Sequence, residues 1–292
     1  MEKLNTMRII STISELQQTL YTLKLAPVGF VPTMGALHEG HISLVRRAVP
    51  DCPVVVVSIF VNPTQFNDKN DLKNYPRTLE SDLEMLGKIL RKDDIVFTPA
   101  VEEMYPEEDK RVFSFGNLDN VMEALHRPGH FNGVAQVVSR LFAAVKPDIA
   151  IFGQKDFQQL AVIKELVRQT KDKVMIIGSP IIREKDGLAM SSRNTLLLPG
   201  IRKNAGIIFS TLTKATEMMK TRDIPEIKDF VNSTINEVEG FSVIYFEIVD
   251  DVQLFPVSLK KEMSPEKKYF GCIAVKAGNI RLIDNVEFGC YQ

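Results

Sequence analysis

All four histidines of the chain lie in two short motifs, HEGH with His38 and His41, and HRPGH with His126 and His130. HEGH follows the apolar stretch 29–33 and precedes a segment with helical spacing, so a strand is expected to pass into a helix there. Free amide groups at a helix N-terminus favour phosphate, and two histidines three residues apart can both donate hydrogen bonds to phosphate oxygens. HEGH therefore indicates phosphate chemistry. An ordinary strand–helix turn with two surface histidines is the alternative.

Two further polar clusters have the same character. GQKD at 153–156 follows a predicted strand and begins a predicted helix, and MSSR occupies 190–193. Lys155 can pair with phosphate, and Asp156 can cap the helix or reach a ribose or a metal ion. Two hydroxyls beside Arg193 provide donors and a fixed positive charge. Each cluster alone is also typical of a solvated surface loop.

A fourth polar group follows the continuous apolar run 53–61. Pro63 ends the expected strand there, and Asn62, Thr64 and Gln65 come directly after it. The uncharged amide of Gln65 suits a substrate hydroxyl, carboxylate or amine. A turn in which these amides bind only the backbone is an equal alternative.

Metal-site and disulfide patterns are weak in this sequence. HEGH spaces its histidines at i and i+3, whereas the zinc-protease motif needs i and i+4. Cys52, Cys272 and Cys290 are odd in number and form no CxxC pair. This usage suits a reducing cytosol and predicts neither a structural zinc site nor a disulfide framework.

Composition excludes several classes of protein. The chain has 292 residues, 45% of them hydrophobic, and a formal net charge of −1, which argues against nucleic acid as the main partner. Its longest apolar run is less than half of the ~20 residues that span a bilayer. Glu2 lies early, and the N-terminal stretch has no unbroken apolar region, so no secretory signal is expected. We expect a globular cytoplasmic protein without a membrane partner.

The first part of the chain alternates apolar runs with helical patterns. The β-branched run 53–61 is typical of a strand buried on both faces of a parallel sheet. This alternation predicts an α/β fold with a Rossmann-like parallel sheet in an N-terminal domain, residues 1–184, whose strand order stays open. The expected strands are 29–33, 53–61, 94–97, 148–152 and 173–178, and the expected helices are 41–49, 79–90, 134–145 and 157–169.

The pattern changes after residue 184. Two helices in succession are followed by strands, and Ala277-Gly278-Asn279 joins the last two strands as a hairpin. We expect a smaller α+β C-terminal domain, residues 185–292. Its expected helices are 201–220 and 225–239, and its expected strands are 242–250, 268–276 and 279–283.

Taken together and in order, the motifs resemble the HxGH nucleotidyltransferase superfamily, with MSSR in the position of the KMSKS-type loop. More closely, the chain resembles the pantoate–β-alanine ligases. The resemblance is strong over about residues 29–195 and weaker beyond. It rests on PTMGALHEGH, FVNPTQF, YPRTLESDL, RPGHFNGVAQVV, GQKDFQQLAVI, GLAMSSRN and RLIDN.

The resemblance implies a reaction and its partners. Family members condense (R)-pantoate with β-alanine, forming pantothenate, AMP and diphosphate through a pantoyl adenylate, as a step of coenzyme A biosynthesis. ATP is the co-substrate and Mg²⁺ accompanies it. The resemblance also implies a cytoplasmic homodimer joined through its first domain, with the C-terminal domain closing over the active site.

The resemblance implies a role for each matching residue. His41, His38 and Lys155 are the expected catalytic residues, with His41 as proton donor. Gln65 and Gln159 are expected to bind pantoate, and Gln65 to touch β-alanine too. Asp82 is a candidate ligand of Mg²⁺. The expected ATP site comprises Met34, Gly35, Ala36, Leu37, His38, Glu39, Gly40, His41, Gly153, Gln154, Lys155, Asp156, Ile182, Met190, Ser191, Ser192 and Arg193.

The sequence also departs from the family's usual pattern. Asn132 stands where a charged residue is common, and Gln136 replaces a small residue. Phe157 replaces a frequent tyrosine, and 199–201 replaces a more acidic helix start. None of these positions has an expected catalytic role.

Three other functions compete with the ligase. An adenylyltransferase that makes a dinucleotide cofactor is the nearest, but the pair Gln65 and Gln159 suits a small hydroxy acid better. A non-catalytic nucleotide-binding regulator is disfavoured by intact His38, Lys155 and Arg193. A tRNA ligase is disfavoured because the charge balance leaves no basic anticodon-binding domain.

Overall fold

The computed structural model describes residues 7–66 and 69–289. The chain divides into two compact units. The first comprises 1–115, 127–154 and 162–180, and the second comprises 116–126, 155–161 and 181–292. The expected domain boundary between 184 and 185 stays a prediction. The division also groups two short segments that precede residue 184, 116–126 and 155–161, with the C-terminal part.

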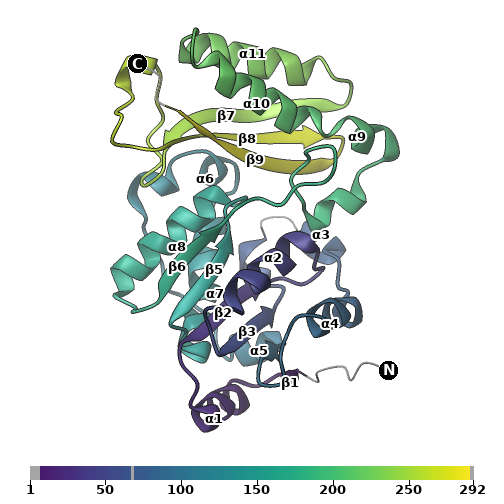
Figure 1. The fold of residues 1–292 in the computed structure, drawn as a ribbon, viewed down its shortest axis with the longest axis vertical. Coiled ribbons are helices and arrows are strands. Elements are labelled where there is room, and N and C mark those ends of the chain that lie inside the picture. The colour runs from purple at the N-terminus through teal and green to yellow at the C-terminus, as the bar shows by residue number, and fades with distance from the viewer. Residues whose placement is uncertain (1–6, 67–68, 290–292) are drawn as a thin grey trace. The chain divides into compact units, whose positions relative to one another are not determined.

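A six-stranded parallel sheet forms the centre of the first unit (Figure 1). This confirms the parallel α/β class, and the strand order is β1-β4-β3-β2-β5-β6. The strands are β1 (Arg8–Ile10), β2 (Val28–Thr33), β3 (Val54–Ile59), β4 (Ile95–Phe97), β5 (Ile149–Gly153) and β6 (Met175–Ser179). The valines of β3 are fully buried, as the apolar run predicts for an interior strand.

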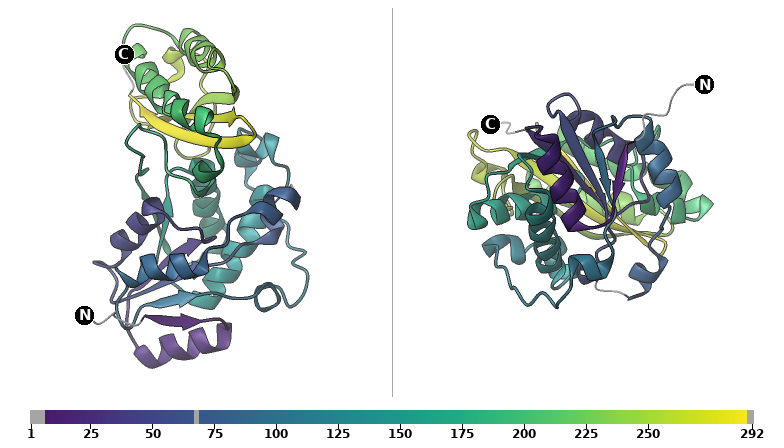
Figure 2. Two further views of the ribbon diagram at one scale, coloured as in Figure 1. Left: turned by 90° about the vertical axis from the view of Figure 1, so that its right-hand side faces the viewer. Right: turned by 90° about the horizontal axis from the view of Figure 1, so that it is seen from below.

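Helices cover both faces of this sheet (Figure 2). On one face, Val31 and Val57 share a core cluster with Val45 and Leu86. On the other face, Phe30 meets Phe142 edge-on, with ring centroids 6.2 Å apart. The helices of the first face are α2 (Glu39–Ala48) and α4 (Leu79–Gly87), and those of the second are α7 (His130–Val145) and α1 (Ile13–Leu23), which packs on α7.

The strand order explains where a ligand would bind. β2 lies between β3 and β5, and the direction in which the chain adds strands reverses between β2 and β5. Loops leaving the carboxyl ends of neighbouring strands diverge at such a switch point, which leaves a crevice for ligands. The HEGH loop follows β2, and Gln154 follows β5.

The second unit contains a three-stranded antiparallel sheet, β7-β8-β9. Its strands are β7 (Phe241–Asp250), β8 (Tyr269–Ala277) and β9 (Ile280–Phe288), and its sheet packs against α10 (Ile207–Met218) and α11 (Ile224–Asn236). The expected hairpin between β8 and β9 is confirmed, with Gly278 at φ 59°. β9 extends five residues beyond the predicted strand because Phe288 still reaches the core.

One predicted helix is wrong. Residues 201–220 form two helices, α9 (Pro199–Asn204) and α10, with the break at Ala205 and Gly206. Gly206 passes so close to Asp186 that a Cβ on it would lie 2.5 Å from the Asp186 carbonyl oxygen. Helical periodicity continues across the break, so only this close approach reveals it.

The side chain of Gln158 joins the segments 116–126 and 155–161, which both belong to the second unit. Its side chain is buried, and Nε2 donates to the carbonyl oxygens of Leu118 and Val121 at 2.8 and 2.9 Å. Its Oε1 accepts from the amide of Glu123 at 2.9 Å. Glu123 in turn accepts from the hydroxyl of Tyr245 on β7. These bonds tie 116–126 and the start of α8 (Phe157–Thr170) to the small sheet.

Two smaller expectations concern cysteines and membranes. Cys52 and Cys272 are buried thiols without a disulfide, and Cys290 lies outside the described residues. Among the described helices, none has the length and apolar character needed to cross a bilayer.

Candidate active site

The HEGH motif forms the turn between β2 and α2. Gly35 and Ala36 have φ values of 79° and 49°, so the loop turns through the left-handed region before the helix. His38 is the N-cap of α2, and its Nδ1 accepts from the Gly40 amide at 3.1 Å. An amide N–H can only donate, so the proton of the neutral imidazole lies on Nε2. His38 therefore presents a donor on the side away from its own helix.

His41 lies against His38 in the first turn of α2. The two ring centroids are 4.1 Å apart, and the ring planes are tilted by 40°. The structure thus brings the two histidines together, as their spacing predicts. Two imidazole rings at a helix N-terminus provide several donors in a place where the helix dipole also favours an anion.

Asp82 holds the loop that carries these histidines. Its side chain is 1% exposed, and its two oxygens accept from the amides of Ala36 at 2.9 Å and Leu37 at 2.8 Å. The hydroxyl of Thr78 donates to the same carboxylate at 3.1 Å. These contacts favour a structural role for Asp82, and its role as a Mg²⁺ ligand stays a prediction.

Gln65 lies in a short turn, Pro63–Gln65, directly after β3. The turn packs against α7 at Gly133, where an added Cβ would lie 2.5 Å from the Thr64 carbonyl oxygen. Asn62 caps the turn and donates from Nδ2 to the Gly133 carbonyl at 3.2 Å. Glycine at position 133 is therefore what allows α7 to hold the Gln65 turn so closely.

His130, in the second histidine motif, supports the same turn. Its Nδ1 lies 2.8 Å from the Gln65 carbonyl oxygen, and its Nε2 lies 3.0 Å from Nη1 of Arg127. A carbonyl only accepts and a guanidinium only donates, so Nδ1 carries the proton and Nε2 accepts. Nothing in the sequence motif indicates this role for His130, and in the structure His130 supports the backbone of Gln65.

Asn132 and Gln136 of α7 hold the segment 109–113 against that helix. Gln136 Nε2 donates to the carbonyl oxygens of Asp109 and Arg111, both at 2.8 Å. Asn132 Oδ1 accepts from the Phe113 amide at 2.9 Å. Both side chains therefore anchor this segment to α7.

Asp109 joins this segment to α7 by charge. Its buried carboxylate accepts from Arg111 Nη2 at 2.6 Å and from Arg140 Nε at 2.9 Å. Hydrogen bonds from Arg111 and Arg140 outweigh the effect of burial and hold the pKa of Asp109 well below its usual range. The carboxylate therefore stays ionised at every pH at which the protein is expected to work.

The MSSR segment lies in the second unit, beside Ile182. The Met190 amide donates to the Ile182 carbonyl at 2.9 Å, and Arg183 pairs with Ala189 in an antiparallel bridge. Ser191 Oγ accepts from the Arg193 amide at 3.2 Å. The structure therefore brings Ile182, Met190 and the Ser-Ser-Arg turn together.

Lys155 also lies in the second unit, where β9 supports its backbone. Asn285 Nδ2 donates to the Lys155 carbonyl at 3.1 Å. The neighbouring Asp284 is buried and accepts two hydrogen bonds from Arg183, at 2.6 and 2.9 Å. Burial raises the pKa of Asp284, and the Arg183 guanidinium opposes that rise. Gln159 is half-buried in the first turn of α8.

A family model described as pantoate-beta-alanine ligase matches residues 8–287. The match includes all three motifs: HEGH at the switch point, GQKD after β5 and MSSR beside Ile182. The chain belongs to this ligase family. A pantothenate synthetase of Bacteroides fragilis is 52% identical over 284 residues, covering 97% of this chain and 99% of the relative. One of Porphyromonas gingivalis is 46% identical, with the same coverage.

Solved structures of the ligase family have the same fold. Pantothenate synthetase from Thermus thermophilus is 42% identical, with a TM-score of 0.88 over 96% of this chain and 99% of that chain. Pantoate-beta-alanine ligase from Francisella tularensis, complexed with beta-gamma ATP and beta-alanine, is 33% identical, with a TM-score of 0.79 over 97% and 98%. This chain is accordingly an enzyme, an ATP-dependent ligase that condenses pantoate with β-alanine.

Proposed function

We propose that this ligase works in two half-reactions on one bound pantoate. A carboxylate oxygen of (R)-pantoate attacks the α-phosphorus of ATP, the bond to the β,γ-phosphates breaks, and pantoyl adenylate and diphosphate form. The unprotonated amine of β-alanine then attacks the acyl carbon, the bond to the AMP oxygen breaks, and pantothenate and AMP leave. The ammonium form of β-alanine loses its protons to solvent or to a base in this sequence.

The observation that carries the assignment of roles is the cap formed by His38. Because Nδ1 accepts from the Gly40 amide, the proton on Nε2 is directed away from the helix and suits an anionic phosphate oxygen. His41 lies 4.1 Å from it between ring centroids and would donate to the same phosphates. Residues 34–41, which form the turn after β2 and the first residues of α2, would hold ATP at the N-terminus of α2.

Further residues expected to bind ATP lie in the second unit. Lys155 and Arg193 would pair with the phosphates, with Gly153–Asp156, Ile182 and Met190–Ser192 around them. As the resemblance implies, we propose that the C-terminal domain closes over the nucleotide. Gln65 and Gln159 would bind pantoate, and an amide at each suits its hydroxyl and carboxylate oxygens.

Magnesium would enter as part of the substrate MgATP. Mg²⁺ is usually held by one or two carboxylates together with substrate phosphates and water, so the protein need not supply a full cage. In residues 7–66 and 69–289, no three His, Cys, Asp or Glu side chains form a group that could hold a metal ion. We assign no residue of the chain to magnesium beyond the candidate Asp82.

Pyrophosphate release from ATP tests the adenylate route. Exchange of bridging and non-bridging oxygens in ATP should occur with pantoate present and β-alanine absent, because adenylate formation reverses while diphosphate stays bound. His41→Ala and Lys155→Ala should each slow adenylation by about 10²–10³-fold. Exchange that required β-alanine would favour a single step of all three substrates, and near-normal turnover in either variant would remove that residue from the site.

We also propose a cytoplasmic homodimer joined through the first domain, as the resemblance implies. Light scattering should give about twice the single-chain mass of 32.9 kDa. A species of single-chain mass at all working concentrations would contradict the dimer. Fractionation of cells that express the full chain should place it with the cytoplasmic enzymes, and recovery outside that fraction would contradict the location.

A further inference from the structure

Asn62 is buried at the carboxyl end of β3, and its backbone partners settle the orientation of its amide. Oδ1 accepts from the Thr64 amide at 3.4 Å, and Nδ2 donates to the Gly133 carbonyl at 3.2 Å. An amide N–H only donates and a carbonyl only accepts. The oxygen of Asn62 must therefore face Thr64, and the NH2 group must face α7.

The orientation of Asn62 determines the orientation of Gln65. Asn62 Nδ2 lies 3.2 Å from Gln65 Oε1, and because Nδ2 only donates, the oxygen end of Gln65 faces Asn62. The other end, Nε2, is 2.9 Å from the sulfur of Met34. A thioether is a weak acceptor, so a substrate oxygen is a much better partner for Nε2. Gln65 thus presents a donor, which suits a carboxylate or hydroxyl oxygen and does not suit an ammonium group.

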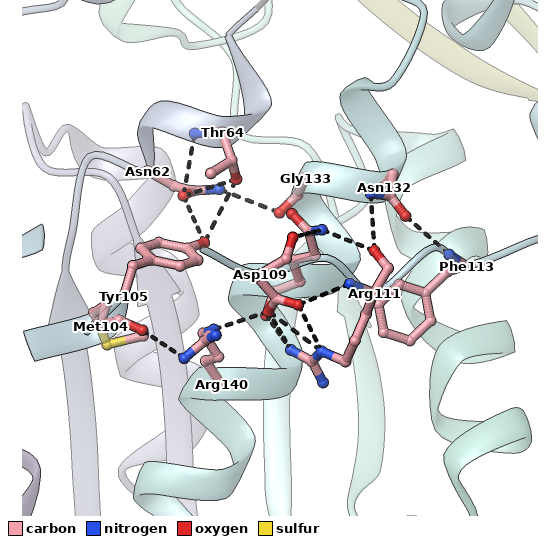
Figure 3. A network of polar contacts seen from close by, with 11 residues as sticks. Asn62, Thr64, Met104, Tyr105, Asp109, Arg111, Phe113, Asn132, Gly133 and Arg140 are labelled. Atoms are coloured by element: carbon pink, nitrogen blue, oxygen red, sulfur yellow. Dashed lines mark hydrogen bonds and ion pairs between the residues drawn. The ribbon is translucent and has the colours of Figure 1, made fainter. Parts of the chain in front are cut away.

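Tyr105 makes the shortest contact to Asn62. Its hydroxyl donates to Asn62 Oδ1 at 2.8 Å, whereas the Thr64 hydroxyl and amide lie 3.1 and 3.4 Å from the same oxygen (Figure 3). Burial raises the pKa of Tyr105, so this hydroxyl keeps its proton at neutral pH. Tyr105 is thus the strongest of the donors that keep Asn62 in place.

The ring of Tyr105 is itself held from α7. The guanidinium carbon of Arg140 lies 4.9 Å from the ring centroid, within the range of a cation–π contact. Arg140 Nη1 also donates to the Met104 carbonyl at 2.9 Å, and its Nε pairs with Asp109. The position of the Tyr105 hydroxyl is therefore determined by α7 and the segment 104–113 together.

We propose that Tyr105 is a positioning residue for recognition of the hydroxy acid. Its hydroxyl holds Asn62, Asn62 holds the oxygen end of Gln65, and the NH2 end of Gln65 is thereby directed to a substrate oxygen. This inference rests on the proposed role of Gln65 in binding pantoate. It adds that Gln65 serves as a hydrogen-bond donor to pantoate.

Tyr105→Phe tests the proposal because it removes one oxygen atom and leaves the ring under Arg140. We expect KM for pantoate to rise about 3- to 10-fold, the effect of losing one hydrogen bond. KM for ATP and kcat should stay within about twofold. Tyr269→Phe is a matched control, because the buried Tyr269 hydroxyl accepts from the Ser264 amide in the second unit. It should change the melting temperature by a similar amount and leave KM for pantoate unchanged.

A double-mutant cycle shows whether Tyr105 acts through Gln65. Gln65→Ala should raise KM for pantoate strongly, and adding Tyr105→Phe to it should produce no further rise. Two independent effects that multiply would overturn the proposal. If Tyr105→Phe is too unstable to assay, Arg140→Lys takes its place, since it loosens the ring but keeps the charge beside Asp109.

The two possible failures give different results. If Gln65→Ala leaves KM for pantoate unchanged, the proposed role of Gln65 is wrong, and the role of Tyr105 falls with it. If Gln65→Ala raises KM for pantoate but Tyr105→Phe matches the wild type, only the positioning role is overturned.

Discussion

Gly133 in α7 lies so close to Thr64 that a Cβ added to Gly133 would be 2.5 Å from the Thr64 carbonyl oxygen and 2.9 Å from the Cα of Gln65. Real Cβ atoms do not approach a backbone this closely, and neither partner is a flexible side-chain end. The helix α7 and the Gln65 turn can therefore pack this closely only because residue 133 is a glycine, which has no side chain. This contact links the packing of the first unit to the proposed recognition of pantoate.

Gly133→Ala should separate α7 from the Gln65 turn. We expect the free energy of unfolding to fall by about 1–3 kcal/mol, as for other overpacked sites, and KM for pantoate to rise. Urea unfolding and steady-state kinetics measure the two effects. Gly200→Ala in α9 is the control, because a Cβ there meets no atom within 4 Å, and it should be neutral or slightly stabilising. A Gly133→Ala variant with wild-type stability would contradict the close contact.

His38→Asn should separate the two functions of His38. Asparagine is a good N-cap, so the cap on Gly40 and the melting temperature should be retained, while the donor on the far side is lost. We expect adenylation to slow by about 10²-fold, measured as pyrophosphate release with pantoate. His38→Ala should slow it equally and also cost about 1 kcal/mol of stability. Adenylation at the wild-type rate in His38→Asn would leave only the capping role.

Asp82→Asn should loosen the loop that carries the histidines. An amide has one acceptor oxygen where the carboxylate offers two, so one of the amides of Ala36 and Leu37 loses its partner. We expect a loss of about 1–3 kcal/mol in stability and a rise in KM for ATP of about 10-fold. Glu84→Gln, on the exposed face of the same helix, should change neither quantity. If only the Mg²⁺ dependence of the rate changed, Asp82 would be a metal ligand instead.

Asp109→Asn should change the acid stability of the first unit. Because Arg111 and Arg140 hold the pKa of Asp109 below its usual range, the native state keeps this carboxylate ionised at a pH where the unfolded chain binds a proton. The stabilisation is therefore complete above the unfolded pKa of about 4 and declines as the pH falls through that value toward the lower native one.

The free energy of unfolding, measured at pH values from 7 to 2.5, gives the contribution of the Asp109 carboxylate to stability. At pH 7 the free energy of unfolding of the wild type should exceed that of Asp109→Asn by about 1–3 kcal/mol. This difference should shrink below pH ~4. Asp93→Asn, which alters an exposed pair with Arg8, should show a difference of less than about 1 kcal/mol at any pH. A difference for Asp109→Asn that did not vary with pH would show that the carboxylate is not the stabilising species.

The sequence by itself determined the parallel α/β class and the turn that carries His38 and His41. These features depend on local signals. The four valines of β3 are consecutive, so along them neither face of the strand is polar, as expected for a strand buried on both faces. A glycine-containing loop between a strand and a helix is recognisable from its neighbours alone. The ordered motifs also indicated the ligase family, and the family comparison confirmed it.

Only the tertiary structure decided which side chains support the site. Tyr105 reaches Asn62 from 43 residues away, and Asn62 bonds to Gly133 from 71 residues away. Periodicity reports whether a residue is buried, but a hydrogen bond between distant residues depends on how whole elements pack. For the same reason, the resemblance named Gln159, whose role stays a proposal, and gave no role to the neighbouring Gln158. The partners of Gln158, Leu118 and Val121, lie on a segment that only folding brings to it.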